Sequence, residues 1–341
     1  MKKPMFRTVA VIGTGVIGRS WIQVFARAGC RVKVFDSDAE VLAGAIDWFE
    51  RDLRDLRRHE LIKRKEAKAR RERVVACETL ADALAGVQYV QESLPESVEI
   101  KNLAYREIDA LLGAKAIVGS STSALDMTDL AQGVAGGRRF IVAHPVNPPH
   151  LIPVVEVLPG VATDPKVTAK TVTFLREVGQ TPVVMKRYAV GFILNRMQAA
   201  LVREAVDLVA SGVASVDAVD VAVRDGLGLR WAFMGPFGVA NTNADQGVRE
   251  YFTRFRKDYH ALWDSLSTTV RFDDELVERL GRETDEMMAA PYERQRQWRD
   301  RMLPMIAGVK AMVPLERDQK PSKARRHKAK TRSQTKSKRR A

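Results

Sequence analysis

The feature that most constrains this chain is a glycine-rich run near its start, Gly13-Thr14-Gly15-Val16-Ile17-Gly18. The run follows the apolar stretch Val9–Ile12 and opens a helix-like stretch, which predicts a strand, a tight turn and a helix in that order. In such a turn the first glycine permits the bend, the second lets the backbone approach a pyrophosphate, and the third lets helix and strand pack closely. Free N–H groups at the start of the helix then bind phosphate oxygens. The pattern predicts a dinucleotide site at Gly13, Gly15, Val16, Ile17 and Gly18.

Asp36 lies 18 residues beyond Gly18, at the end of the apolar run that starts at Arg31. A carboxylate at this place accepts hydrogen bonds from the ribose hydroxyls of an adenosine and repels a 2′-phosphate. No arginine follows in the next three residues, Ser-Asp-Ala, so the sequence favours NAD over NADP. The alternative interpretation is a glycine turn without a ligand, with Asp36 as a cap at the strand end.

The N-terminal part of the chain alternates between apolar runs and helix-like stretches. This order predicts an α/β fold with a doubly wound, mostly parallel sheet. The runs begin at Val9, Arg31, Gln88, Ala116 and Arg139. A densely charged insertion, residues 47–73, is typical of a long surface helix or a helical pair, with either a solvated face or a basic rim that attracts anions.

From about Lys186 the apolar spacing becomes helical and no further strand candidate follows. We therefore expect a Rossmann domain over residues 1–187 and an all-helical C-terminal domain over residues 188–316. Residues 317–341 are polar and basic and are expected to form a disordered tail. Eleven Lys and Arg residues and no acid lie in residues 320–341, so much of the net charge of +14 belongs to that tail.

Composition excludes several classes of protein. The two cysteines, Cys30 and Cys77, are too few and too isolated for a zinc site or a disulfide framework, so no metal is expected. No stretch approaches the roughly 20 apolar residues of a membrane span. Low cysteine usage suits a reducing compartment, and we expect a cytoplasmic protein.

Two residues suit the oxidation of a hydroxyl group. His144 ends an apolar run, where side chains face the ligand crevice of an open sheet, and imidazole is the natural base for an alcohol proton. Glu156 lies within the apolar run 154–158, where an unpaired carboxylate is costly. A His144–Glu156 pair would remove that cost, orient the ring and favour its protonated form. In the alternative, Glu156 faces water from an edge strand and backbone groups satisfy His144.

The motifs GTGVIG, ESLPES, STS, HPVNPP, VVEV, GFILNR and GLGLRWAFMGPF occur together between about residues 6 and 260. In combination they resemble the 3-hydroxyacyl-CoA dehydrogenase superfamily, and most of all its L-gulonate 3-dehydrogenase or lambda-crystallin branch. The resemblance implies NAD as cofactor, a helical domain that forms a homodimer, and oxidation of a 3-hydroxyl group. It also implies that His144 and Glu156 are the catalytic dyad, with His144 as the base.

The resemblance assigns roles to four further residues by matching motif. Ser123 would hydrogen-bond the reacting oxygen, and Asn195 would bind the substrate and polarise the forming carbonyl. Glu96 and Lys101 would line the nicotinamide half of the cofactor. Taken by themselves, Ser123 is equally a turn residue, Asn195 a helix-start residue and Lys101 a solvated lysine.

The expected substrate is a small 3-hydroxy acid. Acyl-CoA members of the superfamily usually carry a phenylalanine-rich HFFNP segment, whereas this chain has AHPVNPPHLIP, as the sugar-acid branch does. Arg230 would clamp a free carboxylate bidentately, or it is a surface or dimer-interface arginine. These features favour an L-gulonate-like acid.

Two other substrates stay open. Carnitine 3-dehydrogenases share a similar RWAFMG-like stretch, in which Trp231 and Phe233 would suit a quaternary ammonium group. A 3-hydroxyacyl-CoA is the second alternative. The segment after Pro236, FGVANTNADQGVREYF, departs from the pattern expected of either the gulonate or the carnitine subgroup.

Two alternatives are not enzymes. One is a crystallin-like structural protein, against which the complete set of Ser123, His144, Glu156 and Asn195 argues. The other is a nucleic-acid binder that uses the basic tail. The tail lacks aromatic residues for base stacking, so any such contact would be non-specific and salt-dependent.

Overall fold

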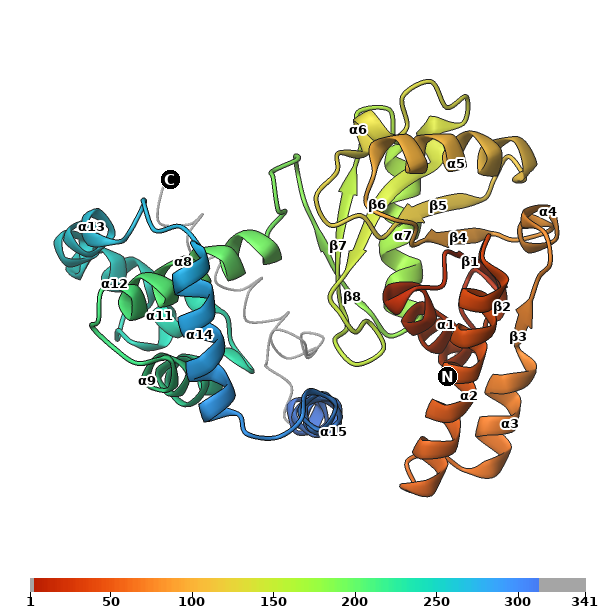
Figure 1. Ribbon diagram of the computed structural model, residues 1–341. Helices are drawn as coiled ribbons and strands as arrows, with labels where there is room; N and C mark the ends of the chain where they lie inside the picture. Colours follow the sequence, from red (N-terminus) through yellow and green to blue (C-terminus); the bar gives the residue numbers. More distant parts are fainter. Residues whose placement is uncertain (1–2, 313–341) are drawn as a thin grey trace, which may run out of the picture. The chain divides into compact units, whose positions relative to one another are not determined.

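The computed structural model describes residues 3–312, and the chain divides into two compact units between Leu201 and Val202 (Figure 1). The first unit is an α/β domain and the second is helical. The division falls inside helix α8 (Leu194–Ala210), whereas the sequence pattern changes near Lys186. The predicted basic tail, residues 317–341, lies outside the described residues.

One sheet of eight strands forms the centre of the first unit, in the order β3-β2-β1-β4-β5-β6-β7-β8. All neighbouring strands are parallel except β6 and β7, so the predicted mostly parallel, doubly wound sheet is confirmed. Three strands, β3, β7 and β8, lie outside the five predicted runs. The strands are β1 (Thr8–Ile12), β2 (Arg31–Phe35), β3 (Val74–Ala76), β4 (Tyr89–Glu92), β5 (Ile117–Ser120), β6 (Phe140–Pro145), β7 (Val154–Pro159) and β8 (Thr181–Val184).

Helices cover both faces of this sheet, because successive strand residues point to opposite sides. Val9 and Val11 enter one core, and Ala10 and Ile12 enter the other. The first core includes residues of α1 (Val16–Ala28), α2 (Ala39–Arg58) and α7 (Pro165–Glu177). The second core includes residues of α4 (Leu80–Leu84), α5 (Val98–Leu111) and α6 (Met127–Leu130).

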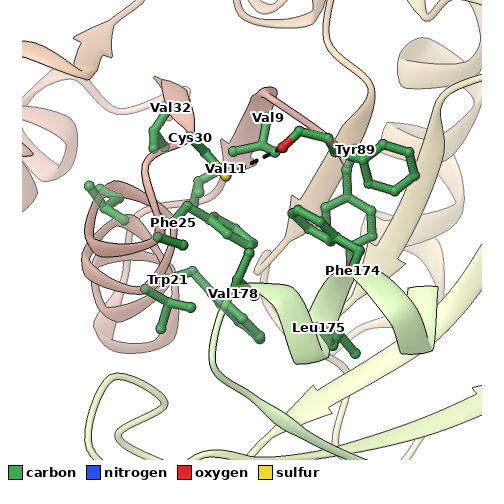
Figure 2. Packing of buried hydrophobic residues seen from close by; sticks show 14 of the residues in the cluster. Val9, Val11, Trp21, Phe25, Cys30, Val32, Tyr89, Phe174, Leu175 and Val178 are labelled. Atoms are coloured by element: carbon green, nitrogen blue, oxygen red, sulfur yellow. Dashed lines mark hydrogen bonds between the residues drawn. The ribbon is translucent and has the colours of Figure 1, made fainter. Parts of the chain in front are cut away.

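Aromatic rings tie three elements together in the first core (Figure 2). Phe174 of α7 lies 4.9 Å from Tyr89 of β4 and 5.8 Å from Phe25 of α1, measured between ring centroids. All three side chains are fully buried, and burial of such a ring contributes about 1.5–3 kcal/mol. This packing fixes α1 against β1 and β4, whose ends carry the glycine turn and the loop that follows Glu92.

The charged insertion forms a helical pair, one of the two predicted forms. Its helices are α2 and α3 (Arg64–Glu72). Asp38 caps the start of α2 by accepting hydrogen bonds from the backbone N–H groups of Glu40 and Val41. Glu50 of α2 forms ion pairs with Arg54 on the same helix and with Arg71 of α3. The pair with Arg71 therefore links the two helices on the surface.

The second unit contains no strand between residues 202 and 312, in agreement with the predicted helical domain. No helix in the described part of the chain is both long enough and apolar enough to cross a bilayer. After α8 come α9 (Val216–Val221), a π-helical segment (Ala222–Gly228), α10 (Leu229–Trp231), α11 (Pro236–Thr242), α12 (Val248–Arg254), α13 (Arg256–Ser265), α14 (Asp274–Met287) and α15 (Tyr292–Met312).

Two glycines at the start of α1 test how closely this helix packs against the glycine turn. A Cβ atom at Gly18 would lie 1.9 Å from the carbonyl oxygen of Gly13, whereas one at Gly15 would have nothing within 4 Å. We expect Gly18→Ala to lower the free energy of unfolding by about 1–3 kcal/mol. Gly15→Ala should lower it by less than about 1 kcal/mol. Urea unfolding of both variants measures this difference, and equal stabilities would contradict the packing described.

Candidate functional site

Several strand ends meet at the carboxyl edge of the sheet. The strand order reverses at β1 and β4, and open α/β sheets bind ligands in the crevice at such a point. Ile12, Glu92 and Ser120 are neighbours on β1, β4 and β5, so the segments that follow them leave the sheet at one edge. Strand β6 runs parallel to β5 and carries His144 toward the same edge.

The glycine turn forms a cradle at this edge. Gly13 adopts φ +84°, and a Cβ atom there would lie 2.7 Å from the carbonyl oxygen of Ser93. Gly15 and Val16 are exposed at the start of α1, and the space beside Gly15 is open. A phosphate group fits this space because nothing blocks its approach to the N–H groups of the helix start. Ile17 instead packs against the first core.

Asp36 is hydrogen-bonded to the turn itself. Its Oδ2 atom accepts bonds from the backbone N–H of Thr14 at 2.7 Å and from the Thr14 hydroxyl at 2.9 Å. Its Oδ1 atom accepts from the N–H of Asp38 at 3.1 Å. The carboxylate is therefore fixed beside the cradle, at the end of β2, where the ribose of an adenosine would lie. The residues present fit a dinucleotide.

His144 and Glu156 face each other across the antiparallel pair β6–β7, where they are register partners. His144 Nδ1 lies 2.9 Å from Glu156 Oε2. Glu156 is 0% exposed and His144 is 8% exposed. The second carboxylate oxygen, Oε1, accepts hydrogen bonds from the backbone N–H groups of Ile193 at 2.8 Å and Leu194 at 3.1 Å.

Glu156 is ionised at neutral pH. Burial alone would raise its pKa, but the hydrogen bonds from His144, Ile193 and Leu194 outweigh burial and hold the pKa below the ordinary value for glutamate. An ionised carboxylate only accepts hydrogen bonds, so His144 Nδ1 must be the donor. The remaining ring nitrogen, Nε2, then carries the lone pair that a general base needs. Within residues 3–312 it has no hydrogen-bond partner.

A turn with left-handed backbone aims the two N–H groups at Glu156. Gly191 has φ +73° and Phe192 has φ +51°, a conformation that a bulky residue rarely adopts. The Phe192 ring is buried and meets the His144 ring edge to face, with 5.4 Å between centroids. Because Ile193 and Leu194 stand at the start of α8, their N–H groups are free to bind Glu156. The turn therefore joins the motif GFILNR to the histidine–glutamate pair.

Ser123, Asn195 and Glu96 also come together. Glu96 Oε1 accepts hydrogen bonds from the Thr122 hydroxyl at 2.7 Å and from the N–H groups of Ser123 at 2.7 Å and Ala124 at 3.0 Å. The Ser123 hydroxyl lies 3.2 Å from the same oxygen. Asn195 Nδ2 donates to the Ser123 carbonyl oxygen at 3.3 Å. Burial would raise the pKa of Glu96, but the bonds from Thr122 and Ser123 and the nearby Lys101 charge hold it below the ordinary value.

Lys101 turns inward instead of toward solvent. Its side chain is 1% exposed, and its Nζ atom donates to Glu92 Oε1 at 2.6 Å and to the Leu94 carbonyl oxygen at 3.0 Å. Sequence reasoning missed Glu92. The signal resembles the one that singled out Glu156, because Glu92 is a glutamate in the predicted strand run that begins at Gln88.

Arg230 belongs to the second unit. It lies on α10 with an exposed side chain, and its contact with a substrate carboxylate stays a prediction. Trp231 and Phe233 are likewise exposed. Among residues 3–312, no three His, Cys, Asp or Glu side chains are grouped as metal ligands.

Replacing Glu156 by glutamine tests its charge. Because the folded pKa lies below the ordinary value of about 4.3, ionised Glu156 stabilises the folded state above that pH. We expect the wild type to be more stable than Glu156→Gln at neutral pH. The difference in the free energy of unfolding should shrink as the pH falls from about 4.3 through the folded pKa. Urea unfolding of both proteins from neutral to acid pH measures this, and a gap that widens in acid would contradict it.

Two successive segments of the chain match the two domains of one protein family. Residues 8–188 match the NAD binding domain of 3-hydroxyacyl-CoA dehydrogenase, and residues 191–289 match its C-terminal domain. The first match contains the glycine turn and the histidine–glutamate pair. The cofactor of the chain is therefore NAD, as the open cradle beside Gly15 and the position of Asp36 also indicate.

Individual proteins similar to this chain support the same family. The chain is 33% identical to lambda-crystallin of Oryctolagus cuniculus, over 92% of this chain and 99% of that protein. It is 36% identical to an L-carnitine dehydrogenase of Oceanobacillus iheyensis, over 80% of this chain and 88% of that protein. A solved structure, an NAD+-dependent 5-formyl-3-hydroxy-2-methylpyridine 4-carboxylic acid 5-dehydrogenase, aligns with a TM-score of 0.72 at 26% identity, covering 90% of this chain and 98% of that one. The chain belongs to the 3-hydroxyacyl-CoA dehydrogenase family.

Proposed function

We propose that this protein oxidises the 3-hydroxyl group of a small 3-hydroxy acid to a ketone, and that its substrate resembles L-gulonate. The observation that carries the proposal is the His144–Glu156 pair, which couples a base to a buried, ionised carboxylate at the edge of the sheet that carries the glycine turn. Burying a charge costs free energy, so a buried carboxylate that orients a histidine favours a catalytic role over a purely structural one.

In the proposed reaction, His144 Nε2 takes the proton of the substrate 3-hydroxyl group. Bound NAD supplies the acceptor for the hydride that leaves C3. Glu156 holds the His144 ring through Nδ1 and stabilises the imidazolium that forms. The pair therefore needs no rearrangement during proton transfer.

Ser123 and Asn195 are the proposed partners of the reacting oxygen. The bond from the Ser123 hydroxyl to Glu96 is long at 3.2 Å, so the hydroxyl can turn to donate to a developing negative charge. Asn195 stands at the start of α8, and its amide donates to the backbone of Ser123. Donors placed before the reaction stabilise such a charge without reorganisation.

The substrate assignment is supported by sequence similarity along nearly the whole chain to lambda-crystallin and by the segment AHPVNPPHLIP. L-carnitine is the second candidate, favoured by the 36% identity to an L-carnitine dehydrogenase. Arg230 is the proposed carboxylate clamp for either acid, because a guanidinium group binds a carboxylate bidentately.

A substrate screen tests this proposal. NAD reduction would be followed with L-gulonate, L-carnitine, 3-hydroxybutyrate and 3-hydroxybutyryl-CoA. We expect the highest kcat/KM with L-gulonate, and His144→Ala should lower kcat by about 100-fold or more while NAD still binds. His59, an exposed histidine after α2, provides the control, and His59→Ala should keep full activity. Carnitine as the best substrate would overturn the gulonate assignment, and an active His144→Ala would overturn the role of the base.

We also propose a homodimer through the helical unit. In its described part, only Val206, Val209, Val239 and Ala240 are buried apolar residues, while many large apolar side chains are exposed. Exposed apolar residues in this number favour an interface, and a second copy of the unit would cover them. Two exposed members are Phe237 of α11 and Trp263 of α13.

Light scattering of the full chain tests the dimer. We expect the mass of two chains for the wild type and a shift toward one chain for Phe237→Glu, because a buried charge opposes association. Val161 is an exposed apolar residue of the first unit, and Val161→Glu should stay dimeric. A wild type that runs as a single chain would contradict the proposal.

A further inference from the structure

Glu92 is the most completely bonded carboxylate in the first unit that the proposed reaction does not use. It ends β4, is 0% exposed, and accepts four hydrogen bonds. Oε1 accepts from the Leu94 N–H at 2.6 Å and from Lys101 Nζ at 2.6 Å. Oε2 accepts from the Tyr105 hydroxyl at 2.7 Å and the Ser120 hydroxyl at 2.7 Å. Burial and the Glu92 charge raise the pKa of Tyr105 well above its ordinary value, so its hydroxyl remains a donor.

Stability alone does not explain a pair of charges buried in this way. Removing an ammonium and a carboxylate from water costs several kcal/mol each, and well-packed apolar residues often stabilise a fold as well or better. The histidine–glutamate pair, with 10% and 0% of its side chains exposed, has a proposed role in the reaction. A further pair of low exposure, Arg139–Asp109, keeps 11% and 12% of its side chains exposed, against 1% and 0% for Lys101 and Glu92. The burial of the Lys101–Glu92 pair therefore needs an explanation other than stability.

The contacts of Lys101 supply that reason. Its Nζ atom also bonds the Leu94 carbonyl oxygen at 3.0 Å and lies 3.8 Å from Glu96 Oε2. Lys101 therefore ties Glu92, at the end of the strand, to the loop that carries Glu96. Glu96 in turn holds the Ser123 backbone N–H at 2.7 Å.

A second route reaches the same serine. Ser120, which donates to Glu92 Oε2, ends β5, and Ser123 follows it by three residues. Glu92 thus fixes both segments that meet at Ser123, the loop after β4 through Lys101 and the end of β5 through Ser120.

We propose that Glu92 is a positioning residue, which acts through Lys101 and Glu96 to hold Ser123 in place for the reacting oxygen. The inference rests on the role proposed above for Ser123. Glu92 itself touches neither substrate nor cofactor in this scheme.

A double-mutant cycle separates this role from a merely structural one. The variants are Glu92→Gln, Lys101→Met and the double variant, in which both charges are removed together. Asp109→Asn/Arg139→Met is the matched control. It removes another ion pair of low exposure, which within residues 3–312 makes no hydrogen bond to Ser123 or Glu96.

Two quantities would be measured on the full chain. The first is hydrogen exchange at the amides of Ser123 and Ala124 in the protein without any ligand, which depends on no substrate. The second is kcat, KM and NAD affinity with the best substrate of the screen. A failed screen would count against the proposed function alone, because the exchange measurement would still decide the role of Glu92.

We expect each single variant to raise exchange at Ser123 and Ala124 and to lower kcat by about tenfold or more. NAD affinity should be nearly unchanged in Glu92→Gln, because Glu92 touches no cofactor in this scheme, whereas Lys101→Met also removes a side chain expected to line the cofactor. The double variant should lose no more than the larger single loss, because Glu92→Gln already breaks the route through Lys101. The control should leave exchange at these amides and kcat unchanged.

Two results would overturn the proposal. Recovery of wild-type exchange and kcat in the double variant would show that the pair only balances its own buried charges. Losses that multiply in the double variant would show that Glu92 does not act through Lys101. If a single variant fails to fold, exchange and kcat of the double variant are compared with those of the control variant. Wild-type exchange and kcat in the double variant would again overturn the proposal.

Discussion

The antiparallel pairing of β6 with β7 is the constraint on which the site depends. If the strand after β6 were also parallel, the chain would leave the sheet after His144 through a crossover helix. The carboxylate partner of His144 would then have to come from elsewhere in the chain. Because the chain returns in the antiparallel strand β7, Glu156 becomes the register partner of His144. His144 Nδ1 then lies 2.9 Å from Glu156 Oε2. Backbone hydrogen bonds thereby set a distance that would otherwise depend on the side chains alone.

Carboxylates with dense hydrogen bonding recur around this pair. Glu156 receives two backbone N–H groups and a ring nitrogen, Glu96 receives a hydroxyl and two backbone N–H groups, and Glu92 receives four donors. A buried or half-buried carboxylate is tolerated only when its oxygens are satisfied, so each one fixes the segments that donate to it. The site is thus assembled from separate segments of the first unit that carboxylates hold together.

The sequence predicted the parts of the site that rest on local rules. The glycine turn and Asp36 could be placed because turn geometry restricts their neighbours, and Glu156 stood out because a charge within an apolar run demands a partner. Strand β7 was considered only as an edge strand in the alternative for Glu156, since a short apolar run has no period that separates strand from helix. That alternative is wrong, because β7 lies between β6 and β8 and Glu156 is buried. β3 and β8 are three and four residues long and carry even less signal.

The contact between Glu92 and Lys101 could not be predicted from the local sequence. Glu92 has its lysine nine residues away on α5, and only the packing of that helix on the sheet reveals that the ammonium points inward. The resemblance to known dehydrogenases predicts only that Lys101 lines the cofactor, and nothing in the local sequence marks it as buried. Similarly, the left-handed turn at Phe192 has no propensity signal, because tertiary packing of its ring against His144 outweighs the backbone preference.

The bond between Asp36 and Thr14 links cofactor choice to the shape of the cradle. Asp36 Oδ2 accepts both the backbone N–H and the hydroxyl of Thr14, the residue between the first two glycines of the turn. A lineage that replaced Asp36 to admit a 2′-phosphate would therefore also release the turn on which the pyrophosphate rests. A change of cofactor preference at Asp36 would thus be coupled to the conformation of the glycine turn.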